Sequence, residues 1–96
     1  MIHQAIAVGL AEELRPVDGH SWVVVPFEGQ LHVDLRSHAT NRQIIAIFIE
    51  SDIISIIIRR KHTQHDFQYC DPELIDKINL FVASAFAARR RTTRSK

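Results

Sequence analysis

The sequence predicts one α+β domain in which a four-stranded antiparallel sheet is flanked by an N-terminal and a C-terminal helix. Three observations predict it: an apolar stripe of helical period at the start, four apolar runs of strand length in the middle, and a marked helix start near the end. With 96 residues, 46% of them apolar and 24% charged, the chain suits a single globular domain. We assign residues 1–90 to this domain and residues 91–96 to a basic, flexible C-terminal tail.

The first helix is expected at about Ile2 to Leu14. Apolar residues recur there at every fourth position, through Ile6 and Leu10, and this spacing places them on one side of a helix. Pro16 and the Asp18-Gly19 pair then favour a turn, so the helix should end before them.

The second helix is the most clearly marked element. Asp71-Pro72-Glu73 combines a capping side chain, a proline at the first position and an acid in the first turn. An apolar face follows, and the helix is expected to run to about Arg90, because basic residues favour the negative end of the helix dipole.

Four runs rich in Val and Ile lie between the helices and have the length and composition of strands. They are Ser21–Pro26, Gln30–Arg36, Gln43–Glu50 and Ile53–Arg60. The links between them are short, which predicts antiparallel pairing of neighbours in a meander.

Two turns set the expected register of this sheet. A three-residue loop at Phe27–Gly29 would place Trp22 opposite Asp34 and Val24 opposite His32, and a two-residue turn at Ser51-Asp52 would place Phe48 opposite Ser55. Both registers gather aliphatic residues on one face, which we expect to form the core under the helices. This set is Val23, Val25, Leu31, Val33, Leu35, Ile45, Ile47, Ile49, Ile54, Ile56 and Ile58.

The opposite face is expected to mix apolar and polar side chains, which is typical of an interface. It carries Trp22, Val24, Gln30, His32, Asp34, Arg36, Ile44, Ala46, Phe48, Glu50, Ile53, Ser55, Ile57 and Arg59. Three alternatives stay open: pairing with a second copy, stacking of bases, or cover by one of the helices. The residues expected to contact a partner or ligand are Trp22, Val24, His32, Ile44, Phe48 and Ile57.

A nucleic-acid partner is the alternative hypothesis, since charge is unevenly spread. Residues 1–58 hold three basic and seven acidic side chains, whereas residues 59–96 hold nine basic and four acidic ones. Aromatic platforms and cations bind single strands together. The expected contacts are Trp22, Phe48, Arg36, Arg59, Arg60, Lys61, Arg89, Arg90 and Arg91. Against it, the net charge is only +1, and Asp34 and Glu50 share the expected face.

Two histidine groupings are weighed as chemical sites and set aside. His62, His65, Asp66 and Cys70 have zinc-ligand chemistry, but they form a single cluster, and a loop between strand and helix explains them. His32 and Asp34, with His20 and His38 nearby, resemble an oriented general base that lacks a neighbouring nucleophile. We therefore expect no catalytic residue, no metal and no cofactor.

The sequence favours a cytoplasmic protein. It shows neither a secretory signal nor an apolar run long enough for a membrane span, and its single cysteine forms no internal disulfide. The expected function is that of a non-catalytic interaction or assembly module acting as a homodimer, with an unidentified protein as the other partner to be considered. The element order is similar to that of several small modules, without a shared motif. Some of these bind single-stranded nucleic acid through an open sheet face, and others, such as secretion-chaperone-like domains, dimerise and hold a partner peptide.

Overall fold

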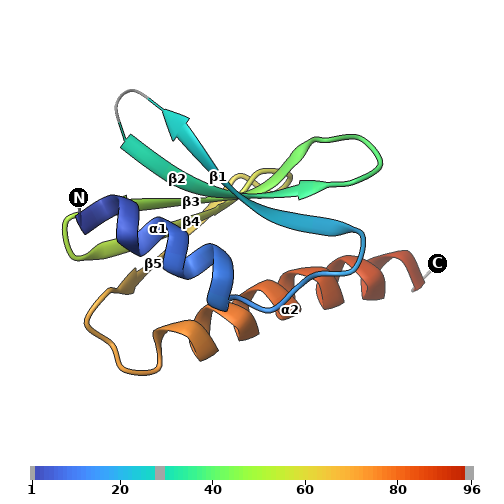
Figure 1. Ribbon diagram of the computed structural model, residues 1–96. Helices are drawn as coiled ribbons and strands as arrows, with labels where there is room; N and C mark the ends of the chain where they lie inside the picture. Colours follow the sequence, from blue (N-terminus) through green and yellow to red (C-terminus); the bar gives the residue numbers. More distant parts are fainter. Residues whose placement is uncertain (1, 28–29, 95–96) are drawn as a thin grey trace.

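The computed structural model describes residues 2–27 and 30–94, which form two helices and a five-stranded antiparallel sheet (Figure 1). The elements are α1 (Ile2–Glu13), β1 (His20–Phe27), β2 (Gln30–Ser37), β3 (Gln43–Glu50), β4 (Ile53–Ile58), β5 (Thr63–Gln68) and α2 (Leu74–Arg94). The strands lie in the sheet in chain order, which confirms the predicted α+β meander. The prediction of four strands is wrong by one, because β5 was expected to be a loop.

β5 was not predicted from the sequence, because its residues do not alternate between apolar and polar. It is held by backbone pairing with β4, from Ile53 opposite Gln68 to Ile58 opposite Thr63. The pairing covers the edge that β4 would otherwise leave open. Only Phe67 among its residues packs against the core, and the other side chains are exposed.

One core holds the molecule together, between the sheet and the two helices. It joins the apolar stripe of α1 to the buried face of α2, with alternate residues of β2, β3 and β4 between them. Its fully buried side chains include Val33, Leu35, Ile45, Ile47, Ile54, Ile56 and Ile78. The aliphatic set predicted for β2, β3 and β4 is thus confirmed wherever the structure describes those side chains.

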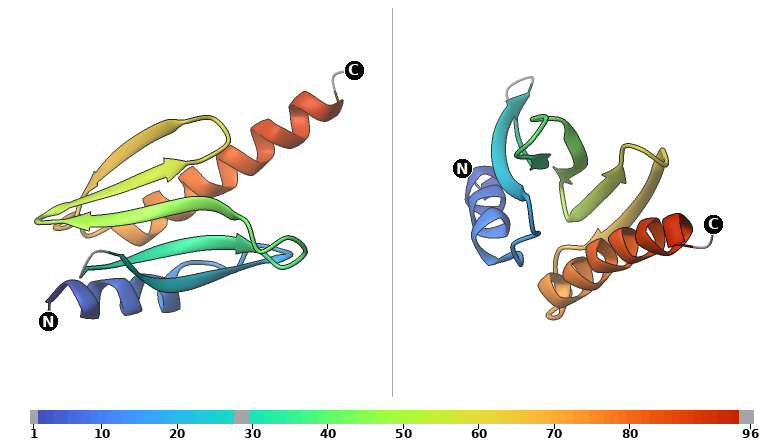
Figure 2. Two further views of the ribbon diagram at one scale, coloured as in Figure 1. Left: turned by 90° about the horizontal axis from the view of Figure 1, so that it is seen from above. Right: turned by 90° about the vertical axis from the view of Figure 1, so that its right-hand side faces the viewer.

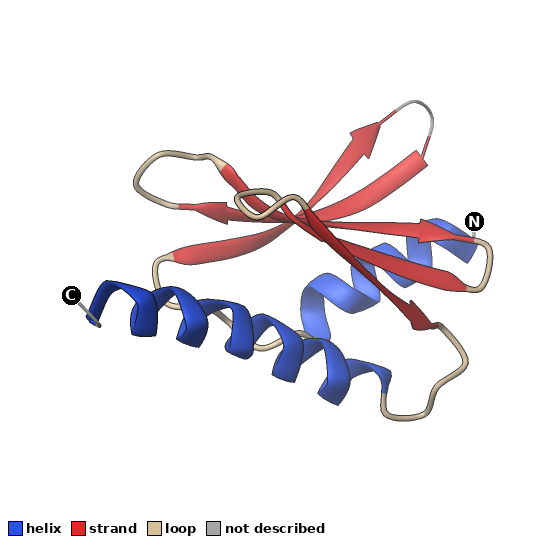
Figure 3. Ribbon diagram, turned by 180° about the vertical axis from the view of Figure 1, so that it is seen from behind, coloured by secondary structure: helices blue, strands red, loops and turns tan. Residues whose placement is uncertain are grey.

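Both helices lie on the same side of the sheet (Figure 3). The α1–β1 linker reaches α2, where the Arg15 backbone N–H donates to Asn79 Oδ1 over 2.9 Å. The opposite face of the sheet carries neither helix. We call it the open face.

The ends of the helices differ slightly from the prediction. Leu14 lies one residue beyond α1, and its N–H still donates to the Leu10 carbonyl. Asp71 caps α2 as predicted, since its carboxylate accepts the Glu73 N–H over 2.9 Å. α2 continues through residues 91–94, which the sequence analysis assigned to the tail. None of the described helices has the length and apolar character needed to cross a membrane.

Candidate functional site

The register of the β1–β2 hairpin differs from the prediction by one residue. Phe27 pairs with Gln30, so Trp22 lies opposite Leu35 and Val24 opposite Val33. A shift of one residue exchanges the two faces of a strand. Trp22 and Val24 therefore pack against the core rather than on the open face, and Val23 takes their place there with 38% of its surface exposed.

The error has a physical cause. Residues 22–25 are Trp-Val-Val-Val, so either register places apolar side chains on both faces and the pattern favours neither. The expected loop, Phe27–Gly29, includes two residues outside the described part of the chain. In contrast, Glu50 pairs with Ile53 and Phe48 with Ser55, as predicted from the Ser51-Asp52 turn.

The open face consists of those alternate residues of the five strands whose side chains point away from the helices, as the strand pairing assigns them. Its apolar members are Val23, Val25, Ala46, Phe48, Ile53 and Ile57, and its polar members are Ser21, His32, Asp34, Arg36, Gln43, Glu50, Ser55, Gln64, Asp66 and Gln68. Val25, Phe48, Ile53 and Ile57 are half-buried by their neighbours, although no helix covers them. This face is the surface on which the sequence analysis placed an interface.

Asp34 is the centre of a hydrogen-bonded network on the open face, and it is fully buried there. Its Oδ2 accepts hydrogen bonds from Nε and Nη2 of Arg36, over 3.2 and 3.0 Å. Its Oδ1 accepts one from Gln43 Nε2 over 2.8 Å and lies 3.1 Å from His32 Nε2. A buried carboxylate needs such partners. The network explains why a charged group can occupy the middle of a sheet.

Two further contacts order the open face. The His32 ring stacks on Phe48, with ring centroids 4.9 Å apart. On the other side of the face, the Asp66 carboxylate accepts hydrogen bonds from the Gln64 amide and the Ser55 hydroxyl, and both lower the pKa of Asp66. The two carboxylate networks, around Asp34 and Asp66, are thus satisfied within this face, and its apolar side chains are the groups that a partner could cover.

Ile44 leaves the expected face because of a β-bulge. The pairing shifts between Leu35 and Arg36, so that Arg36 lies opposite Gln43, and Ile44 is the extra residue. Its side chain packs partly against the core. Of the six residues predicted to contact a partner, the structure places His32, Phe48 and Ile57 on the open face, and Trp22, Val24 and Ile44 against the core.

The predicted pair of stacking aromatics is not formed, because Trp22 and Phe48 lie on opposite faces. Trp22 Nε1 instead donates to the Arg15 carbonyl over 3.0 Å. Among the predicted cations, Arg36 is engaged by Asp34. Arg59, Arg60 and Lys61 form the exposed turn after β4, and residues 89–91 belong to α2.

The histidine-rich segment expected to be a loop is part of β5, and the strand separates its side chains. His65 points to the core side, where its ring stacks on Phe81 with centroids 5.1 Å apart, whereas Asp66 lies on the open face. Within residues 2–27 and 30–94, three or more His, Cys, Asp or Glu side chains nowhere gather as a metal site. Cys70 is exposed.

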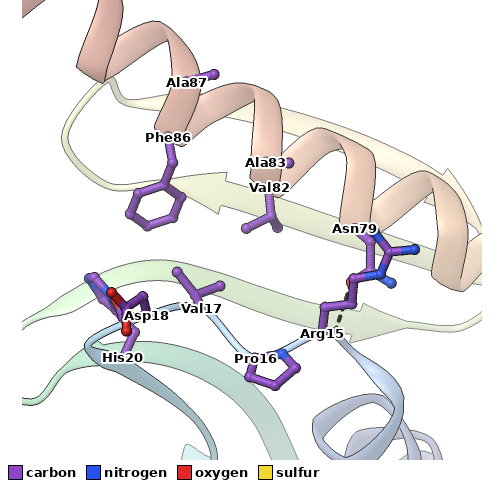
Figure 4. Close-up of a pocket in the computed structure, with 10 residues that line it drawn as sticks. All are labelled: Arg15, Pro16, Val17, Asp18, His20, Asn79, Val82, Ala83, Phe86 and Ala87. Atoms are coloured by element: carbon purple, nitrogen blue, oxygen red, sulfur yellow. Dashed lines mark hydrogen bonds between the residues drawn. The ribbon is translucent and has the colours of Figure 1, made fainter.

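A cleft of about 440 Å³ lies between the α1–β1 linker and α2 (Figure 4). Phe86, Val82 and Val17 form its apolar part, and His20 contacts the edge of the Phe86 ring at 5.3 Å between centroids. Arg15 and Asp18 contribute charged groups to the lining of the cleft. The sequence analysis missed it, because its two walls are about 60 residues apart in the chain.

The sequence analysis also missed a contact between Ser21 and His38. Ser21 Oγ lies 2.6 Å from His38 Nε2, and the His38 N–H donates to the Gly19 carbonyl over 2.9 Å. These bonds fasten the β2–β3 turn to the start of β1. Both side chains are exposed, and a structural role accounts for the contact.

Comparisons with protein-family models, with curated proteins and with solved structures gave no match.

Proposed function

We propose that the protein is a non-catalytic assembly module that forms a homodimer through the open face of its sheet. The observation that carries the proposal is the set of apolar side chains, with Phe48 among them, on a face that no described helix covers. Apolar patches of this kind are typical of interaction sites. An isologous two-fold dimer is the commonest assembly for such a surface.

The charges of the open face favour a second copy as the partner. Glu50 and the adjacent Asp52 lie at one end of the β3–β4 hairpin, whereas Arg59 lies at the other. Suppose that two sheets stack face to face and that the two-fold axis lies between them, perpendicular to the strands. The strands of the two copies then run in opposite directions. The acidic end of each copy then faces the basic end of the other, which is favourable for both.

The test is the mass in solution, measured by light scattering on the wild type and two variants. We expect the wild type at twice the 11.0 kDa of the chain, and Phe48→Asp at 11.0 kDa with an unchanged circular dichroism spectrum. Leu80→Asp is the matched control, because Leu80 is 65% exposed on α2, away from the open face. It should stay dimeric.

Two results would overturn the proposal. A monomeric wild type at micromolar concentration excludes the homodimer. If the Phe48→Asp variant stays dimeric and the Leu80→Asp variant is monomeric, the interface lies on the outer side of α2. Trp22→Asp is unsuitable for this test, because Trp22 packs against the core and its replacement would disturb folding.

A further inference from the structure

Three arginines meet at one end of the sheet. Arg42 directly precedes β3, and Arg59 and Arg60 directly follow β4. Because β3 and β4 are antiparallel, the start of one lies beside the end of the other, and the Arg59 N–H donates to the Ile44 carbonyl over 3.0 Å. Arg42, Arg59 and Arg60 line a hollow of about 260 Å³ with Gln43 and Ile44. We call it the arginine hollow.

The charges of the arginine hollow are not neutralised by other residues in the described part of the chain. The ion pairs found there are His32–Asp34, Arg36–Asp34 and Lys77–Asp71. None involves the hollow or the adjacent Lys61, and all four of these basic side chains are exposed. Three arginines that line one hollow raise the positive potential there, and this potential attracts an anion.

The backbone of the C-terminal part of α2 reaches the same end of the molecule. Ala85 and Phe86 pack beside Ile44 and Ile58, and Ile44 also lines the arginine hollow. The helix then projects past the strands (Figure 2) and continues to Arg94. Four arginines follow Phe86 within these eight residues, at positions 89, 90, 91 and 94.

The acidic residues lie mostly elsewhere. Glu50 and Asp52 are at the far end of the β3–β4 hairpin, and Asp71, Glu73 and Asp76 are at the start of α2. Asp18, in the α1–β1 linker, is nearer, because it lines the same cleft as Phe86. The modest net charge of +1 therefore conceals a basic end and an acidic end.

We propose that the arginine hollow binds phosphate groups of a nucleic-acid backbone, without regard to base sequence. Guanidinium groups bind phosphate oxygens in bidentate fashion. The hollow is open, and the exposed Lys61 adjoins it, which suits a polymer of phosphates better than a single small anion. None of the five residues lining it is aromatic, so base stacking has no part here.

The experiment measures the fluorescence anisotropy of a short labelled oligonucleotide, as single strand and as duplex, over a range of salt concentrations. Two variants of equal net charge are compared with the wild type. One is Arg42→Gln/Arg59→Gln/Arg60→Gln, and the other is Arg89→Gln/Arg90→Gln/Arg91→Gln. Each phosphate contact contributes about 0.7 to the slope of log affinity against log salt for single strands and about 0.9 for duplexes.

We expect wild-type binding that weakens steeply with salt, and a slope reduced by about 2 in the hollow variant. The proposal is wrong if the hollow variant retains the wild-type affinity and slope, whatever the helix variant does, or if the wild type binds neither oligonucleotide at low salt. It is also wrong if polyglutamate competes as well as unlabelled oligonucleotide, since the hollow would then recognise charge rather than phosphate.

This inference does not depend on the proposed dimer. Phe48 lies on the open face outside the hollow, so Phe48→Asp should still bind the oligonucleotide. Arg42 and Arg60 remain available for phosphate whether or not Arg59 faces the partner's acidic end in the dimer. If Phe48→Asp is monomeric and still binds the oligonucleotide, the dimer interface and the phosphate site are independent of each other.

Discussion

At the scale of single residues, Asp34 is the centre of the hydrogen-bonded network on the open face. The carboxylate is fully buried and holds Arg36 and Gln43 in place, next to His32. A buried ion pair is weak evidence for stability in itself, but removal of one partner leaves the others unsatisfied. The position of Asp34 on a polar face was predictable from alternation, whereas its four contacts were not, because Gln43 meets it only through the bulge of β3.

We therefore expect Asp34→Ala to lower the free energy of unfolding by about 2 to 3 kcal/mol, because the Arg36 and Gln43 donors lose their acceptor. Chemical denaturation monitored by circular dichroism measures the change. Asp52→Ala, in an exposed turn, is the control and should have little effect. Equal stabilities of the two variants would show that the network contributes nothing to folding.

Asp71 offers a second prediction at this scale. The Lys77 ammonium donates to its carboxylate over 2.5 Å, and the Glu73 N–H donates as well, so both hold the pKa of Asp71 below its ordinary value. A carboxylate with a lowered pKa stabilises the fold above the ordinary Asp value of about 3.9 and loses that contribution as the pH falls.

Replacement of Lys77 by Met should raise the pKa of Asp71 toward its ordinary value, whereas Lys77→Arg should retain most of the depression. An NMR titration of the Asp71 carboxyl carbon measures both. An unchanged midpoint in Lys77→Met would mean that the helix cap alone lowers this pKa.

At the scale of elements, β1 is the strand whose register is decided by tertiary packing. Its two apolar faces suit either register, yet the structure packs Val24 on the core and exposes 38% of Val23. β5 is the converse case, a polar segment that becomes a strand because β4 offers it an unpaired edge. Neither outcome follows from local residue preferences.

The register predicts opposite results for two neighbouring substitutions. Val24→Asp should destabilise the fold by about 3 kcal/mol or more, because it places a charge against the core. Val23→Asp should keep a cooperative unfolding transition, although on the open face it should weaken the proposed dimer. Thermal and denaturant unfolding measure both. If Val23→Asp were less stable than Val24→Asp, the register expected from a three-residue loop would be the correct one.

At the scale of the whole molecule, charge is separated along the strands. The β3–β4 turn and the start of α2 are acidic, and the arginine hollow and the end of α2 are basic. This polarity supports both proposals. It orients two copies on the open face, and it leaves a cluster of cations for a phosphate backbone.

In the proposed dimer, Glu50→Lys should raise the dissociation constant by up to about thirtyfold at low salt, because the two-fold axis repeats an exposed ion pair worth up to about 1 kcal/mol. The effect should shrink at high salt, because exposed charges are screened. Analytical ultracentrifugation at two salt concentrations provides the measurement, with Glu12→Lys on α1 as the control. An equal effect in both variants would contradict the end-to-end arrangement.

The sequence by itself determined the two helices, the strands from β1 to β4, the tight turn at Ser51-Asp52 and the core face of β2, β3 and β4. Each follows from local periodicity or turn chemistry, in which neighbouring residues carry the signal. Tertiary structure alone decided the register of β1, the formation of β5 and the placing of both helices on one face. It also brought Arg42 to Arg59 and Gln43 to Asp34. These features depend on pairing between distant segments, whose free energy is not encoded in any one stretch of the chain.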